Sequence, residues 1–196
     1  TEVLVDVALS GVDEATPNFD GEVHVLEVGV GTGCISLSIA TERPQTRVYA
    51  TDLSPQAIAL ATRNRDALEL QERVELIECD LVEDVPAELA QSFSVLVSNP
   101  PYIPTNVLEQ EVPAEVKGFE PELALDGGED GLDVYRRLLE AAPHMLLPGG
   151  MLCVELYEGH LDKAAHLAEE QGVWESVEVK EDLTHRPRIL VARLAK

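Results

Sequence analysis

Four consecutive residues, Asn99, Pro100, Pro101 and Tyr102, could together hold a planar amino or amide group. They follow an apolar run at residues 93–97, which predicts a buried strand that ends just before them. The two prolines lack backbone N–H donors, so this loop presents carbonyl oxygens that accept hydrogen bonds. The Asn99 side chain adds another oxygen and Tyr102 a flat ring. Methyl transfer to an amide or an exocyclic amine would need such a site; the alternative is a simple turn that ends a strand.

A second candidate is the glycine run Gly29, Gly31 and Gly33, which lies between a β-rich run at residues 23–28 and a helical pattern at residues 34–40. Strand, glycine turn and helix in this order are typical of the opening of a nucleotide-binding fold. A dinucleotide fingerprint needs its third glycine three residues after the second, where Cys34 stands. The pattern therefore disfavours NAD, and a tight turn without a ligand is the alternative.

With Glu27 two residues ahead of the first glycine, this run resembles motif I of the class I S-adenosylmethionine-dependent methyltransferases. The resemblance implies that the turn passes close to the methionine part of the cofactor and that Glu27 faces the cationic side of the cofactor. The implied cofactor-binding residues of the turn are Gly29, Val30, Gly31, Thr32 and Gly33. Glu27 and Val30 replace the aspartate and the small polar residue that are usual in this motif.

Acidic residues stand at the carboxyl ends of the next two predicted strands: Asp52 is the last residue of the strand at residues 47–52, and Asp80 follows the strand at residues 74–79. Asp52 comes 23 positions after Gly29, where a carboxylate can accept hydrogen bonds from both hydroxyls of a ribose. Asp80 follows the neighbouring strand, where a carboxylate can accept the N6–H of an adenine. A helix cap at Asp52 and a plain turn at Asp80 are the alternatives. Leu53 and Leu81 would then pack on the adenine faces, or else belong to the core.

The composition excludes several classes of protein. The chain has 196 residues and a net charge of −23, from 37 acidic and 14 basic residues, which argues against binding nucleic acid by phosphate neutralisation. Its five histidines lack the spacing of zinc ligands, so we expect no metal site. Cys34, Cys79 and Cys153 lie in apolar segments and predict small buried side chains in a reducing, cytoplasmic setting. No apolar run is long enough to span a membrane.

The elements that must position these residues alternate between strands and helices. Strands are predicted at residues 23–28, 47–52, 74–79, 93–97, 151–156, 174–179 and 188–194, and helices at residues 3–8 (ended by Gly11), 34–40, 55–70, 131–146 and 160–171. The alternation implies an α/β fold with a parallel sheet and helices on both faces. The last two strands have no helix between them and should form an antiparallel pair at the edge. Residues 103–130 predict a lid or binding loop.

Further stretches make the chain resemble the HemK/PrmC family of protein-(glutamine N5) methyltransferases. Beside Asp52, Asp80 and residues 99–104, these are Phe119-Glu120-Pro121, residues 124–132, and Tyr135 with Arg136. The opening residues 1–5 and the closing Asp182, Leu183, Arg186 and Arg188 fit as well, so the resemblance runs essentially from end to end. Tyr157 and His185 depart from the pattern, since they stand where glycines are common.

The resemblance implies a class I, Rossmann-like methyltransferase fold with a seven-stranded sheet, S-adenosylmethionine as donor and S-adenosylhomocysteine as product. The implied acceptor is the glutamine of the Gly-Gly-Gln motif in peptide chain release factors. Residues 1–196 are then one catalytic domain, without the amino-terminal helical domain that helps family members to bind the release factor, so we expect weaker substrate binding. Two alternatives stay open: an amino-directed methyltransferase that acts on adenine N6 or guanine N2 of nucleic acid, and a non-catalytic cofactor-binding protein.

Overall fold

The computed structural model describes residues 1–18, 21–110 and 125–196, and these residues are built around one seven-stranded sheet. The strands are β1 (Val23–Val28), β2 (Thr46–Asp52), β3 (Val74–Glu78), β4 (Phe93–Ser98), β5 (Leu146–Glu155), β6 (Trp174–Glu181) and β7 (Pro187–Leu194). Their order across the sheet is β3-β2-β1-β4-β5-β7-β6. Within the described sheet β7 is the one reversed strand, antiparallel to both β5 and β6. The predicted mostly parallel sheet with an antiparallel pair at its edge is confirmed, with β6 as the outermost strand of the pair.

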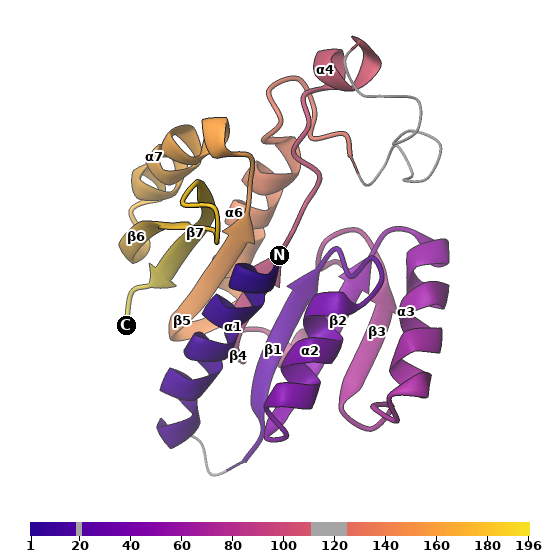
Figure 1. The fold of residues 1–196 in the computed structure, drawn as a ribbon. Coiled ribbons are helices and arrows are strands. Elements are labelled where there is room, and N and C mark those ends of the chain that lie inside the picture. The colour runs from indigo at the N-terminus through magenta and orange to yellow at the C-terminus, as the bar shows by residue number, and fades with distance from the viewer. Residues whose placement is uncertain (19–20, 111–124) are drawn as a thin grey trace.

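Helices cover both faces of this sheet, as the alternation of elements predicts (Figure 1). The helices are α1 (Glu2–Ala15), α2 (Cys34–Glu42), α3 (Pro55–Ala67), α4 (Thr105–Gln110), α6 (Asp133–Met145) and α7 (Leu161–Gln171), with 3-10 turns at Thr16–Asn18, Ala87–Leu89 and Glu158–His160. Helices α1, α2 and α3 lie on one face, and α6 and α7 lie on the other. Helix α4 stands beyond the end of β4, above the sheet in Figure 1.

The two faces follow from the alternation of side chains along buried strands. On β4, Val95 and Val97 pack with α1 and α2, whereas Leu96 packs with α6 and α7. Because both faces are covered by helices, strand residues of both parities are apolar, which is the pattern of a parallel sheet. The polar residues that follow the strands therefore stand out at the carboxyl ends.

Local signals set several helix boundaries. Ser54 accepts a hydrogen bond from the Ala57 backbone N–H at 3.3 Å, and Pro55 is the first residue of α3. Gly172, with φ +67°, ends α7 in the left-handed conformation. Both boundaries confirm what the sequence predicts.

Three local predictions are wrong. Helix α1 does not end at Gly11 but continues to Ala15, because Gly11 is buried and lets the helix approach the Val95 and Met151 side chains where a Cβ would collide. Strand β5 begins at Leu146 rather than Met151, and its pairing with β4 shifts between Phe93 and Val95. Cys34 is exposed, since it is the first residue of α2; Cys79 and Cys153 are buried as predicted.

None of the helices in the described part of the chain combines the length and hydropathy that crossing a bilayer requires.

Candidate active site

Three of the predicted site residues, Asp52, Gly29 and Asn99, lie along one row at the carboxyl edge of the sheet. Thr51, Val28, Ser98 and Val154 are register partners across the neighbouring strands β2, β1, β4 and β5. The residues that follow them are Asp52, Gly29, Asn99 and Glu155. This row crosses the point where the chain passes from the β1–β2–β3 half to the β4–β5 half, which is where open α/β sheets bind ligands.

The glycine turn is held open by positive φ angles and by Asp52. Gly29, Gly31 and Gly33 have φ of +82°, +52° and +84°, a region that residues with a Cβ enter at a cost. The Gly31 N–H donates to Asp52 Oδ2 at 2.9 Å. A Cβ added to Gly29 or Gly31 would meet nothing within 4 Å. The turn therefore presents bare backbone to open space, as close approach of a ligand requires.

The other residues of the turn divide into core and surface. Val30 is buried and packs with Ala50 and Ala61 beneath the turn, so its side chain anchors the loop. Thr32 is exposed, and its carbonyl accepts a hydrogen bond from Asn64 Nδ2 at 2.8 Å. Gly33 is the N-cap of α2.

Glu27 lies beneath the same turn and is 1% exposed. Its Oε2 accepts the Ser36 backbone N–H at 2.9 Å, and within the described structure its Oε1 has no hydrogen-bond partner. Burial raises the pKa of Glu27 to about 8, and the nearby charge of Asp52 adds to that rise. A buried carboxyl with an unsatisfied oxygen beneath an open turn suits a cationic ligand, which would favour its charged form.

Asp52 fixes the turn before α3 and is also an available acceptor. Its Oδ1 accepts the Ser54 N–H at 2.9 Å, while Oδ2 binds Gly31 as described above. A carboxylate offers about four lone-pair positions, so acceptor capacity remains for a hydroxyl group. The helix-cap alternative is wrong for Asp52, because Ser54 is the N-cap of α3, and the bonds of Asp52 are compatible with the predicted ligand role.

The predicted adenine side lies at the ends of β2 and β3. Asp80 Oδ2 accepts a hydrogen bond from Arg137 of α6 at 2.8 Å, a pair that the sequence did not indicate. Leu53 is 51% exposed, so it is not a core residue and remains available for packing. Leu81 is partly buried against the α6–α7 core, and its carbonyl accepts the Thr51 hydroxyl at 2.6 Å.

Asn99 follows β4, and its side chain contacts Thr1, the N-cap residue of α1. Its Nδ2 donates to Thr1 Oγ1 at 3.3 Å, a bond that uses a donor of the amide and not its oxygen. Helix α1 starts at the carboxyl edge, beside the segment that rises from β4 toward α4 (Figure 1). Tyr102 is half-buried against the α6–α7 core. Pro100 is buried and Pro101 half-buried, between these two side chains in the chain.

Residues 125–131, called here the 125–131 loop, are bonded to the chain just after Tyr102. The Ile103 N–H donates to Leu125 O at 3.0 Å, and the Gly127 N–H donates to Ile103 O at 2.8 Å. Both Gly127 and Gly131 pack so closely on the Tyr102 backbone that a Cβ at either would collide with it. Within the segment predicted as a lid, residues 125–130 thus hold the end of the Asn-Pro-Pro-Tyr loop in place, and the contact of the 125–131 loop with Tyr102 and Ile103 is called the clasp below. Phe119, Glu120, Pro121 and Ala124 lie outside the described residues.

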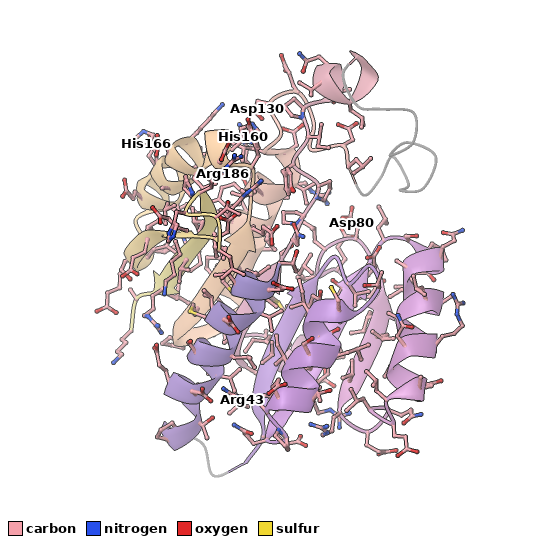
Figure 2. The ribbon with its side chains drawn as sticks, in the orientation of Figure 1. Arg43, Asp80, Asp130, His160, His166 and Arg186 are labelled. Carbon is pink, nitrogen blue, oxygen red and sulfur yellow. The ribbon has the colours of Figure 1, made fainter. Side chains whose placement is uncertain are left out.

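Asp130 anchors the 125–131 loop to α6 and α7. It accepts hydrogen bonds from Arg136 at 2.5 and 2.9 Å and from Lys163 at 2.5 Å. These bonds, with Arg136 contributing most, hold the pKa of Asp130 well below its usual value. Figure 2 shows Asp130 and His160 together beside α7, with Asp80 apart from them. His160 packs on Gly131, and burial lowers its pKa.

Sequence reasoning missed Glu155, Arg137 and the clasp. Glu155 is an acidic residue at the end of a buried strand, as Asp52 is, so the same sequence pattern could have identified it. Arg137 and the clasp had no such signal, because each acts through a partner far away in the chain. Across residues 1–18, 21–110 and 125–196, no group of three or more histidine, cysteine or acidic side chains is placed to hold a metal ion.

Comparison with known proteins gives a match to a family model. Residues 10–116, more than half of the chain, match the model described as the methyltransferase small domain. That span includes the glycine turn, Asp52, Asp80 and residues 99–102.

Named relatives extend over almost the whole chain. A release factor glutamine methyltransferase from Clostridium acetobutylicum is 36% identical over 98% of this chain and 65% of its own length. One from Cereibacter sphaeroides is 42% identical over 99% of this chain and 64% of its own length. The resemblance to this group is confirmed, and the chain spans a little under two thirds of these curated relatives.

Solved structures agree on the fold. A crystal structure of a methyltransferase from Pyrococcus furiosus superimposes with a TM-score of 0.64 at 19% identity, covering 95% of this chain and 83% of the other. With the observed sheet order, this confirms the class I methyltransferase fold that the sequence predicts.

Proposed function

We propose, from the premise that this chain belongs to the methyltransferase small domain family, that it methylates the side-chain nitrogen of a glutamine in peptide chain release factors. The donor in this proposal is S-adenosylmethionine, and the acceptor glutamine is that of a Gly-Gly-Gln motif. The observation that carries the proposal is the place of Asn99, which follows Ser98, the register partner of Val28 just before the glycine turn, and whose amide nitrogen donates to Thr1.

The residues at the glycine turn fit the proposed donor. The open space over Gly29 and Gly31 leaves room for a ligand against the backbone, and Asp52 beside it can accept hydroxyl groups. The buried Glu27 oxygen without a partner would be compensated by a nearby positive charge. When bound, S-adenosylmethionine supplies a methyl group on a positively charged sulfur, so the group to be transferred is already activated.

The protein's contribution to the reaction is to hold the acceptor. An amide nitrogen is a weak nucleophile because its lone pair is delocalised into the carbonyl group. The Asn99 side-chain oxygen and the Pro100 carbonyl can accept both amide hydrogens, and the Tyr102 ring can pack on the amide plane. Such fixed acceptors favour the geometry in which the lone pair localises and hold the nitrogen in place. The clasp keeps this loop rigid by fixing the Tyr102 backbone.

The charge of the chain favours a protein acceptor over nucleic acid. An adenine amino group and a glutamine amide present the same planar NH₂, so the loop at Asn99 does not distinguish them. A chain with net charge −23 repels a phosphate backbone but tolerates a polypeptide. The names of the relatives point to a protein acceptor as well.

The test uses labelled S-adenosylmethionine with four acceptors in parallel: a release factor, its Gly-Gly-Gln glutamine-to-alanine variant, duplex DNA and ribosomal RNA. We expect label in the release factor and none in the alanine variant. Label in either nucleic acid would support the amino-directed alternative instead. Undiminished label in the alanine variant would contradict the proposed acceptor. Binding of the cofactor with no transfer at saturating release factor would support the non-catalytic alternative.

A further inference from the structure

Glu155 is the fourth member of the row that contains Asp52, Gly29 and Asn99, and no role described above uses it. It is the last residue of β5 and directly follows Val154, the register partner of Ser98. The side chains of Val97 and Cys153, two residues earlier on each strand, both pack on the α1 face. By the same alternation Asn99 and Glu155 project from that face side by side at the carboxyl edge.

The Glu155 carboxylate is largely enclosed and forms an ion pair with the amino nitrogen of Thr1, but without a hydrogen bond. Its side chain is 13% exposed, and its Oε2 has no hydrogen-bond partner in the described structure. A buried acceptor that lacks a donor costs on the order of 1–3 kcal/mol, and more when it is charged. The charge of the Thr1 amino nitrogen offsets part of that cost, but it forms no hydrogen bond to Oε2 in the described structure, so Oε2 keeps the capacity to accept an N–H donor.

One residue already contacts both side chains. The amino nitrogen of Thr1 lies 3.0 Å from Glu155 Oε2, without hydrogen-bond geometry, and the Thr1 hydroxyl accepts a bond from Asn99. A backbone nitrogen at Glu155 and a side chain at Asn99 can therefore come from a single residue. One residue can reach both side chains because Asn99 and Glu155 end neighbouring strands, which lie about 4.8 Å apart.

We propose that Glu155 accepts a hydrogen bond from the backbone N–H of the acceptor glutamine while Asn99 holds its side-chain amide. This inference rests on the proposed function. A glutamine that is flanked by glycines exposes its backbone N–H, because glycine has no side chain to cover it. The bond would be charge-assisted, and it would place the main chain of the acceptor relative to its reacting nitrogen. Glu155 is on this view a positioning residue for the acceptor.

The test removes the donor and the acceptor of this bond separately. One synthetic peptide contains Gly-Gly-Gln, and a second has an ester in place of the peptide bond before glutamine, which deletes only the N–H. Affinity is measured calorimetrically with S-adenosylhomocysteine present, and kcat/KM is measured by methyl transfer. In the wild type we expect the ester to bind about tenfold more weakly. In Glu155→Met both peptides should bind alike, and Glu155→Gln should fall between.

Glu158→Gln is the matched control, because it removes the same charge from a neighbouring residue that instead faces Arg186 at 3.6 Å. It should keep the tenfold ratio. The same ratio in Glu155→Met would overturn the inference and leave the proposed function standing. If Glu155→Met no longer binds S-adenosylhomocysteine, Glu155→Gln decides: a ratio below that of Glu158→Gln supports the bond, and an equal ratio overturns it. A wild type that neither binds nor methylates the glutamine peptide would overturn the proposed function and this inference with it.

Discussion

The two sides of the carboxyl edge are built in different ways. The cofactor side consists of the glycine turn and Asp52, which belong to two consecutive βα units and are joined by the bond from Gly31 N–H to Asp52. The acceptor side consists of Asn99, Tyr102, the 125–131 loop and the start of α1, which bond across 21 to 98 positions of the chain. The first side joins two consecutive βα units across 21 positions, whereas the second also needs the start of α1, which is 98 positions away from Asn99.

This difference predicts that the two sides can be damaged separately, and Asn99→Ala is the largest such change. Loss of the oxygen that accepts the substrate amide should lower kcat on the order of 10³-fold, as for other fixed groups that stabilise a transition state. Affinity for S-adenosylhomocysteine should stay within about twofold. Labelled methyl transfer and calorimetry measure the two effects, with the exposed Asn106→Ala as control. Retained turnover would show that residues 99–102 form only a turn.

Asp52→Ala should damage the cofactor side instead. The variant loses the acceptor proposed for the ribose hydroxyls and also the bond that holds Gly31. The expected loss of S-adenosylhomocysteine affinity is about 1.5–3 kcal/mol, the range for hydrogen bonds to a charged group. Calorimetry should show no such loss for the exposed Asp6→Ala. Equal affinities in the two variants would remove Asp52 from the cofactor site.

Gly127→Ala tests whether the clasp positions the acceptor loop. A Cβ at Gly127 would lie 2.7 Å from Tyr102 Cα and 2.9 Å from Gly131 Cα, both backbone atoms that cannot turn aside. We expect about 1–3 kcal/mol of lost stability from overpacking and about tenfold lower kcat/KM for the release factor. Gly21→Ala is the control, since a Cβ there meets nothing within 4 Å. Thermal unfolding and steady-state kinetics measure the two effects. Equal stability and equal kcat/KM in the two variants would show that the clasp does not position the acceptor loop.

Glu27→Gln tests the buried carboxyl beneath the glycine turn through the pH dependence of stability, without a ligand present. Burial raises the pKa of Glu27 from 4.5 to about 8 in the folded chain, so the folded state binds the proton more tightly than the unfolded state does. The free energy of unfolding of the wild type should therefore fall, relative to the variant, as pH rises from about 5 to 8.

The difference between Glu27→Gln and the wild type should change by at least about 1 kcal/mol over that range, given 1.36 kcal/mol per pKa unit. Denaturant unfolding at several pH values measures it. The exposed Glu42→Gln should show no trend of this kind. A flat difference for Glu27→Gln would mean that its carboxyl is ionised throughout.

Much of the fold could be predicted because its signals are local. The strand at residues 23–28, the cap at Ser54 and Pro55, and the stop at Gly172 all depend on neighbours in the chain. The end of α1 was mispredicted at Gly11 for the opposite reason. A glycine usually ends a helix, but here it gives Met151 and Val95 room to pack, and those residues belong to other strands.

By itself the sequence determined the class of fold, the glycine turn and the set of polar residues that follow the strands, because hydrophobic periodicity and turn chemistry act over a few residues. Only the tertiary structure decided which of those residues meet. The Ser98 hydroxyl donates to Val28 O at 2.7 Å across 70 positions, because β4 lies beside β1 in the sheet. The strand order β1-β4-β5 places Asn99 next to Gly29 and Glu155 next to Asn99. Strand order and register are set by the packing of both helical layers on the sheet, which no local stretch of sequence encodes.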